Sequence, residues 1–319
     1  MKKAVFINGG GSRVAEIFQQ YIPQGFQGVC ISKETPEQEK AAALQDAEYL
    51  ILHPAAIDDA LLKNAGKLKH IQLLTAGYDK MNIPLCRELG ISVATNGGAN
   101  SWSVAEHSLA MLLAVYRRIV DGDRAVRAGA WRGPLPEFTT FELAGKTVGV
   151  LGAGNIGRKV AARYKAFETE ILYYDIAASD YMEKELNARR GSIEEIVREA
   201  DILSIHLPLF DSTRGILGAA EFAAMKPGMV LVNTGRAELV DTKAMIGALQ
   251  QKRILAAALD VFDEEPIAAD SPLLRMEQVL LSPHIAGHSA EGWNRRLSFA
   301  WQNLQRVTEG QAALSLVRH

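Results

Sequence analysis

The clearest chemical signature in the sequence is a glycine pattern, G-x-G-x-x-G, formed by Gly152, Gly154 and Gly157. An apolar stretch typical of a strand precedes it, and a stretch typical of a helix follows it. In this setting the first glycine allows a tight turn, the second lets a pyrophosphate approach the backbone, and the third lets the helix pack closely on the sheet. Free amides of the first helical turn would face the phosphates. The pattern predicts a dinucleotide site that includes Asn155 and Ile156.

A second strand-like stretch ends on Asp175. A carboxylate at this position can accept hydrogen bonds from both hydroxyls of a ribose, and it would repel a 2′-phosphate. We therefore expect NAD as the cofactor, with NADH preferred over NADPH. A glycine-rich turn alone is weak evidence, but the order of strand, turn, helix, strand and acid is specific.

Hydride transfer is the chemistry that a bound nicotinamide implies. A carbonyl that accepts the hydride also needs a proton donor and a positively charged group to hold the substrate. Three expected strands of the second half end on residues that can supply or support these groups: Arg236, Asp260 and His284. The planar guanidinium of Arg236 suits a carboxylate or an α-keto acid.

His284 is the expected proton donor, because it lies between Pro283 and Gly287 at the end of a strand. A loop histidine considered alone is more often structural or solvated. A nearby acid changes this balance, since a carboxylate bonded to one ring nitrogen favours the imidazolium and orients the other nitrogen to donate. Strand ends on one side of a parallel sheet gather within reach of one another. We therefore expect Glu265, just beyond Asp260, to pair with His284.

Other residues are candidates on weaker grounds. His206 ends a strand and is placed to approach the cofactor, and His53 ends another and is placed to line a substrate pocket. Residues 74–79 close a strand with small residues whose amides can bind a ligand, although a plain tight turn explains them equally well. The remaining histidines are interpreted as structural or surface residues: His70, His107, His288 and His319. The sequence lacks metal-ligand spacing and a G-x-S-x-G motif, so we expect neither a catalytic metal nor a hydrolase.

The composition fits a globular protein of two domains. The chain has 319 residues, of which 48% are hydrophobic and 23% charged. A net charge of −2 gives no electrostatic reason to bind nucleic acid or an anionic membrane. Cys30 and Cys86 lie outside any disulfide or metal pattern, which favours a reducing compartment. Because no stretch approaches membrane-spanning length, we expect a cytoplasmic protein.

Strand-like and helix-like stretches alternate along the chain, as in parallel sheets covered by helices on both faces. The expected strands are residues 4–7, 28–31, 49–52, 71–74 and 92–94, then 148–151, 171–174, 202–206, 230–233, 256–260 and 279–281. The expected helices include residues 13–21, 37–45, 57–64, 192–199, 219–225, 243–251 and 291–308. The fold class is therefore α/β, and the last helix is expected to return to the first domain.

The region between the two halves has its own signals. Residues 96–100 are the expected linker. Ser103 and Glu106 have the spacing of a capping box, which predicts that a helix starts there. Its apolar stripe can form core or a subunit contact. Residues 121–136 are polar and are expected to be irregular.

Together these motifs resemble the D-isomer-specific 2-hydroxyacid dehydrogenase family, which includes phosphoglycerate, glyoxylate/hydroxypyruvate and D-lactate dehydrogenases. The matching segments follow one another in order over most of the chain: residues 76–79, 103–107, 152–157, 206–209, 233–236, 260–262, 265–266 and 282–287. The resemblance implies two doubly wound parallel-sheet domains. These are a flavodoxin-like substrate domain of residues 1–97 plus 288–319 and a Rossmann NAD-binding domain of residues 98–287. It also implies lobes that close on the substrate and a homodimer built around the helix after Ser103.

The resemblance assigns roles to individual residues. Arg236 would grip the substrate, His284 would act as acid and base, and Glu265 would tune His284. Substrate contacts would come from Ala76, Gly77 and His53 as well as Arg236. The implied cofactor contacts are Gly152, Gly154, Asn155, Ile156, Gly157, Asp175, His206, Pro208, Thr213, Thr234, Gly235, Asp260 and Gly287. The sequence departs from the family at Ala237, where a glycine commonly follows the arginine, which puts the local backbone in question.

The reaction that these roles imply is reduction of an α-keto acid, in which NADH gives hydride to the carbonyl carbon and His284 gives a proton to the oxygen. Two alternatives remain. A relative of the same fold can oxidise formate or phosphite, and formate is disfavoured because its enzymes carry glutamine where Glu265 stands. The family's NAD-dependent corepressors are binding modules, but they carry recruitment extensions that these 319 residues do not show. The motifs do not specify the substrate's side chain.

Overall fold

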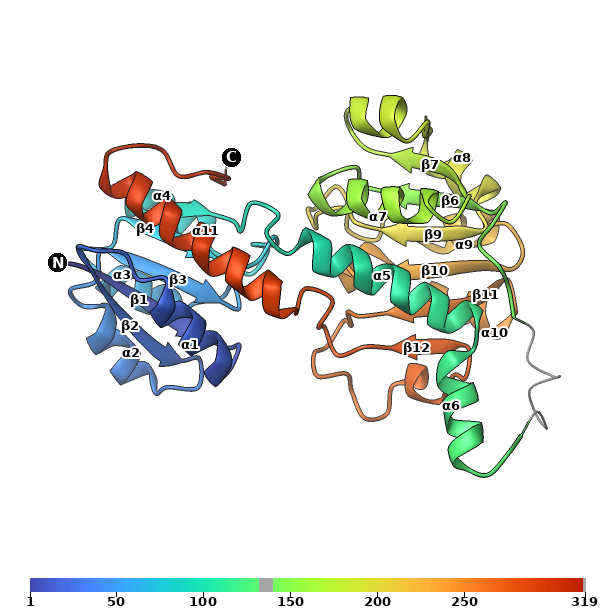
Figure 1. Cartoon of the computed structure of the whole chain (residues 1–319), viewed down its shortest axis with the longest axis horizontal. Coiled ribbons are helices and arrows are strands. Elements are labelled where there is room, and N and C mark those ends of the chain that lie inside the picture. The colour runs from blue at the N-terminus through green and yellow to red at the C-terminus, as the bar shows by residue number, and fades with distance from the viewer. Residues whose placement is uncertain (132–139, 318–319) are drawn as a thin grey trace. The chain divides into compact units, whose positions relative to one another are not determined.

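The computed structural model describes residues 1–131 and 140–317. The chain forms two compact units (Figure 1). The first unit joins Met1–Asn100 to the chain from His288 onward, and the second unit comprises Ser101–Gly287. Each unit is a parallel sheet covered by helices, so the predicted α/β class with two such domains is confirmed. Within the described ranges, no helix is both long and apolar enough to cross a bilayer.

The first unit has a five-stranded parallel sheet in its described part, in the order β2-β1-β3-β4-β5. The strands are β1 (Lys2–Asn8), β2 (Phe26–Ser32), β3 (Tyr49–His53), β4 (His70–Leu73) and β5 (Ser92–Ala94). The helices are α1 (Ser12–Gln20), α2 (Glu37–Leu44), α3 (Asp59–Asn64), α4 (Ile83–Glu88) and α11 (Ala290–Thr308). This strand order is that of flavodoxin-like domains.

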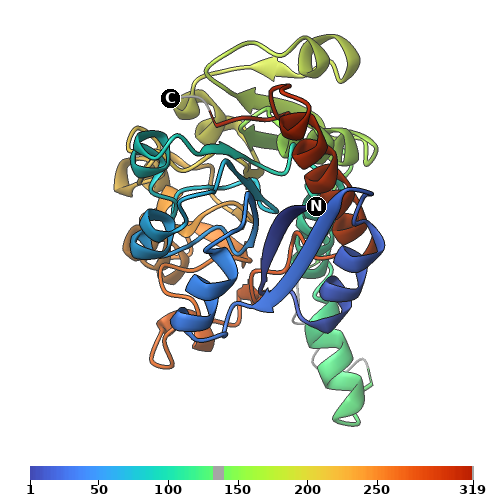
Figure 2. The same ribbon diagram turned by 90° about the vertical axis from the view of Figure 1, so that its left-hand side faces the viewer.

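Two apolar layers hold the first sheet, because successive residues of a strand point to opposite faces. Val5 and Leu50 belong to the layer that also contains residues of α3 and α4. Phe6 belongs to the other layer, where its ring lies 5.2 Å from that of Phe18 on α1. The ring of Phe18 in turn lies 5.1 Å from that of Trp301 on α11. The last helix therefore packs beside α1 on one face of this sheet (Figure 2).

The second unit has a seven-stranded parallel sheet in its described part, in the order β12-β11-β10-β9-β6-β7-β8. The strands are β6 (Thr147–Leu151), β7 (Glu170–Tyr174), β8 (Arg189–Arg190), β9 (Ile202–Ile205), β10 (Met229–Asn233), β11 (Ile254–Leu259) and β12 (Val279–Leu281). Counted from β6, this is the Rossmann order 3-2-1-4-5-6 with one further strand, and the order reverses between β6 and β9. Ligands of such sheets bind at this reversal, outside the carboxyl ends of the strands.

The helices of the second unit are α5 (Ser101–Tyr116), α6 (Ile119–Arg127), α7 (Asn155–Lys165), α8 (Ile193–Glu199), α9 (Ala219–Ala224) and α10 (Thr242–Gln250). All of them except α6 pack on one or the other face of the second sheet. One apolar layer contains residues of α5 and α7, and the other contains residues of α8, α9 and α10. Short π- or 3-10-helical turns are η2 (Tyr181–Glu185), η3 (Ala237–Leu239) and η4 (Pro272–Arg275).

The capping box predicted at Ser103 is wrong. Helix α5 already begins at Ser101, so Ser103 is a buried residue of the first turn, and Glu106 forms an ion pair of 2.7 Å with Arg163 of α7. A local hydrogen-bonded turn explains the earlier start, since Nδ2 of the Asn96 side chain donates to Oδ1 of Asn100 over 3.0 Å directly before the helix.

The irregular structure predicted for residues 121–136 is wrong in its first part, where α6 extends to Arg127. This helix buries none of its side chains, and its polar sequence therefore did not indicate a helix. Ion pairs one helical turn apart support it instead, such as the pair of 2.9 Å between Asp123 and Arg127. Pro134 and Pro136 of the predicted segment lie outside the described residues, as does His319.

Candidate active site

The glycine pattern forms the turn between β6 and α7, and the structure gives a steric reason for two of its glycines. Gly152 has a φ of 99°, and a Cβ there would lie 2.7 Å from the carbonyl oxygen of His206. A Cβ at Gly157 would lie 1.8 Å from the carbonyl oxygen of Gly152. Gly154 precedes the first helical residue, and a Cβ there would meet no heavy atom within 4 Å apart from its chain neighbours and its own helix. The second glycine therefore borders open space at a helix start, where phosphate oxygens can reach free amides.

Asp175 follows β7 and ties the strand end to the glycine turn. Its Oδ2 accepts a hydrogen bond of 2.7 Å from the amide of Ala153. Arg190 lies beside it, because its Nη2 donates to the carbonyl oxygens of Asp175 and Ile176 over 2.9 and 3.0 Å. A guanidinium at this place bears on cofactor choice, since an arginine near the ribose can accommodate a 2′-phosphate. From the sequence alone Arg190 is interpreted as part of a solvated face, because the strand that places it beside β7 has only two residues, Arg189–Arg190, and no apolar run.

Three adjacent strands, β10, β11 and β12, bring the predicted chemical groups to one edge of the second sheet. Arg236 follows β10, and its half-buried side chain donates through Nη1 to the carbonyl oxygen of Gly235 over 2.9 Å. The buried side chain of Asn233 fixes this turn from both sides. It donates to the carbonyl oxygen of Arg236 over 2.9 Å and accepts from the amide of Gly235 over 3.0 Å.

Ala237 causes no backbone strain where the family commonly has glycine. It begins the 3-10 turn η3, it is buried, and its φ is not positive. The turn after Arg236 therefore does not require a glycine at this position.

Glu265 and His284 are in direct contact, as predicted. Oε2 of Glu265 lies 2.8 Å from Nδ1 of His284, and Oε1 of Glu265 accepts from the amide of Phe262 over 3.2 Å. Because Nδ1 faces the carboxylate, Nε2 is the ring nitrogen that can give a proton to a substrate. The His284 side chain is 45% exposed, so a ligand can reach it.

The backbone of His284 has a φ of 55°, which costs roughly 1–3 kcal/mol for a residue other than glycine. The carboxylate of Asp260 stabilises this conformation through hydrogen bonds to the backbone. It is fully buried, and its two oxygens accept from the amides of Ile285 and Ala286 over 3.0 and 2.8 Å. Asp260 was expected to contact the cofactor; in this structure its carboxylate binds the backbone of the loop of His284.

The predicted substrate residues of the first unit lie at the carboxyl ends of its strands. Ala76 and Gly77 belong to the loop after β4, where the hydroxyl of Thr75 donates to the carbonyl oxygen of Gly77 over 2.8 Å. His53 ends β3, and its ring packs edge-on against Trp293 with centroids 4.8 Å apart. The ring of His288 lies 6.0 Å from that of His53.

Comparison with known proteins agrees with this geometry. Residues 109–286 match the D-isomer specific 2-hydroxyacid dehydrogenase, NAD binding domain. A glyoxylate reductase of Aeropyrum pernix is 39% identical over 307 residues, which cover 95% of this chain and 89% of that protein. This chain belongs to the D-isomer specific 2-hydroxyacid dehydrogenase family. It is thus an NAD-dependent enzyme that interconverts 2-keto acids and D-2-hydroxy acids.

Solved structures of relatives share the fold over the whole length. The apo-structure of D-lactate dehydrogenase from Escherichia coli has a TM-score of 0.84 at 27% identity, with 100% of both chains covered. An acyclic imino acid reductase in complex with NADPH and D-Arg has a TM-score of 0.86 at 25% identity, again with full coverage of both chains. A nicotinamide dinucleotide is therefore the cofactor of this dehydrogenase, and the glycine turn with its open second position fits one.

The other predicted cofactor contacts of the dehydrogenase surround the same sheet edge. Nε2 of His206 pairs with the hydroxyl of Ser204 over 2.8 Å, and burial lowers the pKa of His206 to about 3, so the ring is neutral. Thr213 donates to the carbonyl oxygen of Pro208 over 2.7 Å in the exposed loop after β9. Thr234 precedes Gly235, and Gly287 follows Ala286 at the end of the second unit.

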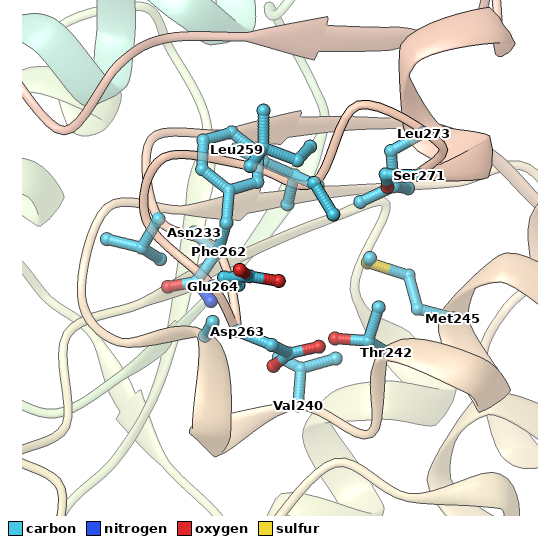
Figure 3. Close-up of a pocket in the computed structure, with 14 residues that line it drawn as sticks. Asn233, Val240, Thr242, Met245, Leu259, Phe262, Asp263, Glu264, Ser271 and Leu273 are labelled. Carbon is cyan, nitrogen blue, oxygen red and sulfur yellow. The ribbon is translucent and has the colours of Figure 1, made fainter.

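A cavity of about 250 Å³ lies among residues that follow β10 and β11 (Figure 3). Its walls include Asn233 and Ala237, next to Arg236, and Phe262 and Glu264, next to Glu265. Aliphatic side chains such as Leu259 form much of the rest. No residue of the glycine turn lines it. In the described part of the chain, no three histidine, cysteine or acidic side chains gather as metal ligands.

Proposed function

We propose that this dehydrogenase reduces a small 2-keto acid of the glyoxylate type, with His284 as the acid. The observation that carries the proposal is the 2.8 Å contact between Glu265 and Nδ1 of His284. A carboxylate at Nδ1 favours the charged ring and leaves Nε2 as the nitrogen that can give a proton. Similarity to the glyoxylate reductase of Aeropyrum pernix supports the choice of a small keto acid.

The proposed mechanism needs two side chains at the reacting atoms. The bound nicotinamide supplies the hydride that reaches the carbonyl carbon of the substrate. His284 gives the Nε2 proton to the carbonyl oxygen as the negative charge develops there, and Glu265 stabilises the charged ring until that moment. Arg236 attracts electron density toward the same oxygen and binds the carboxylate. One hydride and one proton thus convert the keto acid to the D-2-hydroxy acid, and the reverse steps oxidise it.

The first unit supplies the remaining substrate contacts in this proposal. Backbone amides around Ala76 and Gly77 would hold the carboxylate, and His53 would contact the rest of the molecule. Residues 1–97 with 288–319 would then act as the substrate domain, and residues 98–287 as the NAD-binding domain.

We also propose that NADH is preferred over NADPH. The carboxylate of Asp175 is fixed by the amide of Ala153 and remains half-exposed, so it can bind ribose hydroxyls and repel a 2′-phosphate. Arg190 acts against this preference only weakly, because its guanidinium already donates to two backbone carbonyl oxygens.

The protein is further proposed to be a cytoplasmic homodimer. Both cysteines, Cys30 and Cys86, are free thiols, as expected in a reducing compartment. Trp102, in the first turn of α5, is 46% exposed, and Ile119, the first residue of α6, is 59% exposed. Large apolar side chains that are exposed in this way suit a subunit contact. Light scattering after size exclusion should give twice the mass of one chain, and a monomer would contradict the dimer.

The test of the reaction is a screen of NADH oxidation over 2-keto acids of graded size and charge. Glyoxylate and hydroxypyruvate should give the largest kcat/KM, and bulky aromatic keto acids the smallest. The panel should include NAD reduction with phosphite as the rival reaction. Turnover of phosphite alone, or of no compound in the presence of bound NADH, would contradict the proposed function.

A further inference from the structure

Two consecutive residues of α5 contact the two loops that carry the proposed catalytic side chains. Nε2 of His107 lies 3.0 Å from Oγ of Ser282, at the start of the loop of His284. Oγ of Ser108 lies 2.8 Å from Oγ1 of Thr234, at the start of the loop of Arg236. Consecutive residues of an α-helix point about 100° apart, so neighbours on one helix can reach two different strand ends. Helix α5 packs on β10, β11 and β12, which makes both contacts possible.

His107 also lies near Asp260, the buried acid that binds the loop of His284. Nε2 of His107 is also 3.6 Å from Oδ1 of Asp260, the oxygen that accepts the amide of Ile285. Because a carboxylate repels a nitrogen lone pair, the ring faces Asp260 with its Nε2 hydrogen and donates to Ser282. A fully buried carboxylate is costly unless donors surround it. His107 therefore adds a favourable electrostatic contact to Asp260, whose hydrogen bonds come from the two amides that follow His284.

The Ser108 contact orients Thr234. The Ser108 hydroxyl is buried, and its one hydrogen goes to the carbonyl oxygen of Val104 over 2.8 Å. The hydrogen between the two hydroxyls must therefore come from Thr234, which sets the direction of that side chain. Thr234 lies between Asn233 and Gly235. The Asn233 side chain donates to the carbonyl oxygen of Arg236, and the carbonyl oxygen of Gly235 accepts from the guanidinium of Arg236.

We propose that α5 braces the active site through two positioning residues, His107 for the loop of His284 and Ser108 for the loop of Arg236. This rests on the proposed function, in which those two loops carry the reacting side chains. Neither residue touches the substrate; each acts through the loop that it holds. Loss of one contact should leave the other intact, because Ser282 follows β12 and Thr234 follows β10.

Amide hydrogen exchange of the full chain tests the bracing without any turnover. His107→Ala should speed exchange of the Ile285 and Ala286 amides about tenfold and leave residues 233–237 unchanged. Ser108→Ala should have the opposite pattern. His107→Gln retains a donor at the reach of Nε2 and should restore most of the protection. Glu106→Gln, one residue away and on the exposed side, is the matched control and should change neither loop.

Steady-state kinetics with glyoxylate then separates the two roles. His107→Ala should lower kcat about tenfold with KM changed less than twofold, because the proton donor is misplaced. Ser108→Ala should raise KM more than it lowers kcat, because the carboxylate-binding arginine is misplaced. Partial recovery of kcat in His107→Gln is expected if the lost group is the donor itself.

Clear outcomes would overturn the inference. These are exchange and kcat of His107→Ala within twofold of the original protein, equal effects of both alanine variants on both loops, or no recovery in His107→Gln. If His107→Ala fails to fold, Ser282→Ala removes the acceptor of the same bond and takes its place. A protein that turns over no 2-keto acid would contradict the proposed function, whereas the exchange experiment would still decide whether α5 holds the loops.

Discussion

The second sheet has two groups of strand ends that differ in how they would bind a ligand: one end of the sheet at β6 and β7, and the other at β10 to β12. At β6 and β7 the site consists of backbone, with three glycines and free amides around one carboxylate, Asp175. At β10 to β12 it consists of side chains that other side chains hold in place, such as Glu265 against His284. The backbone site depends on the absence of side chains at a few positions. The side-chain site depends on the type and geometry of every group in it.

The largest effect should come from removing the proton donor of the side-chain site. His284→Ala should lower kcat by about 10³-fold, the range expected for a positioned general acid. Binding of NADH, measured by fluorescence titration, should remain within a few-fold. A variant that keeps more than a tenth of kcat would mean that the two ends do not divide cofactor binding and proton transfer in this way.

The backbone site should fail when a single methyl group is added at the wrong glycine. Gly157→Ala places Cβ 1.8 Å from a carbonyl oxygen, so the turn must shift and the free energy of unfolding should fall by roughly 3 kcal/mol. Gly154→Ala is the matched control, because its Cβ meets open space, and it should cost less than about 1 kcal/mol in denaturant titration. Weaker NADH binding by Gly154→Ala would show that the open space receives the pyrophosphate. Equal stability of both variants would refute the steric explanation.

A conservative change should damage the side-chain site nearly as much. Arg236→Lys keeps the charge but loses the planar fork, so kcat/KM with glyoxylate should fall about 10²-fold. The dissociation constant of NADH is the control and should not change. A decrease below threefold would show that charge alone suffices at this end.

Asp175 should affect cofactor choice more than catalysis. Asp175→Asn keeps an acceptor for the amide of Ala153 but removes the charge, so the ratio of kcat/KM for NADPH to that for NADH should rise about tenfold. Arg190→Ala in the same background should reverse part of this gain, because a 2′-phosphate would lose its nearest guanidinium. An unaltered ratio in Asp175→Asn would contradict the proposal that Asp175 binds the ribose hydroxyls of the cofactor.

The smallest effect concerns His206 at the end of β9, between the two ends of the sheet. Burial lowers its pKa from 6.5 to about 3, so the unfolded chain binds a proton that the folded chain excludes. The free energy of unfolding should therefore fall as the pH drops from about 7.5 toward 3, by about 1 kcal/mol between pH 6.5 and 5.5, and stay level above about pH 7.5 from this cause. His206→Asn should flatten that slope in denaturant titrations at pH 5.5 and 7.5; an unchanged slope would contradict a desolvated ring.

Local patterns were enough to predict most of the fold and part of the site. Apolar runs bounded by turns identified strands because burial on both sides of a parallel sheet leaves little room for polar residues. They failed for α6, whose side chains are all at least partly exposed, and for the start of α5, which depends on a turn formed by Asn96 and Asn100. The glycine pattern was readable because its steric requirements arise within a few residues.

Residue types and their spacing were enough to identify the residues that could do chemistry and the strand ends on which they would lie. The contacts that hold those groups were visible only in the folded chain. Asp260 proved to fasten the loop of His284, and His107 reaches Ser282 across 175 residues of chain. A hydrogen bond depends on ångström-scale placement of its donor and acceptor. That placement results from the packing of helices and strands far apart in the chain, which no local pattern encodes.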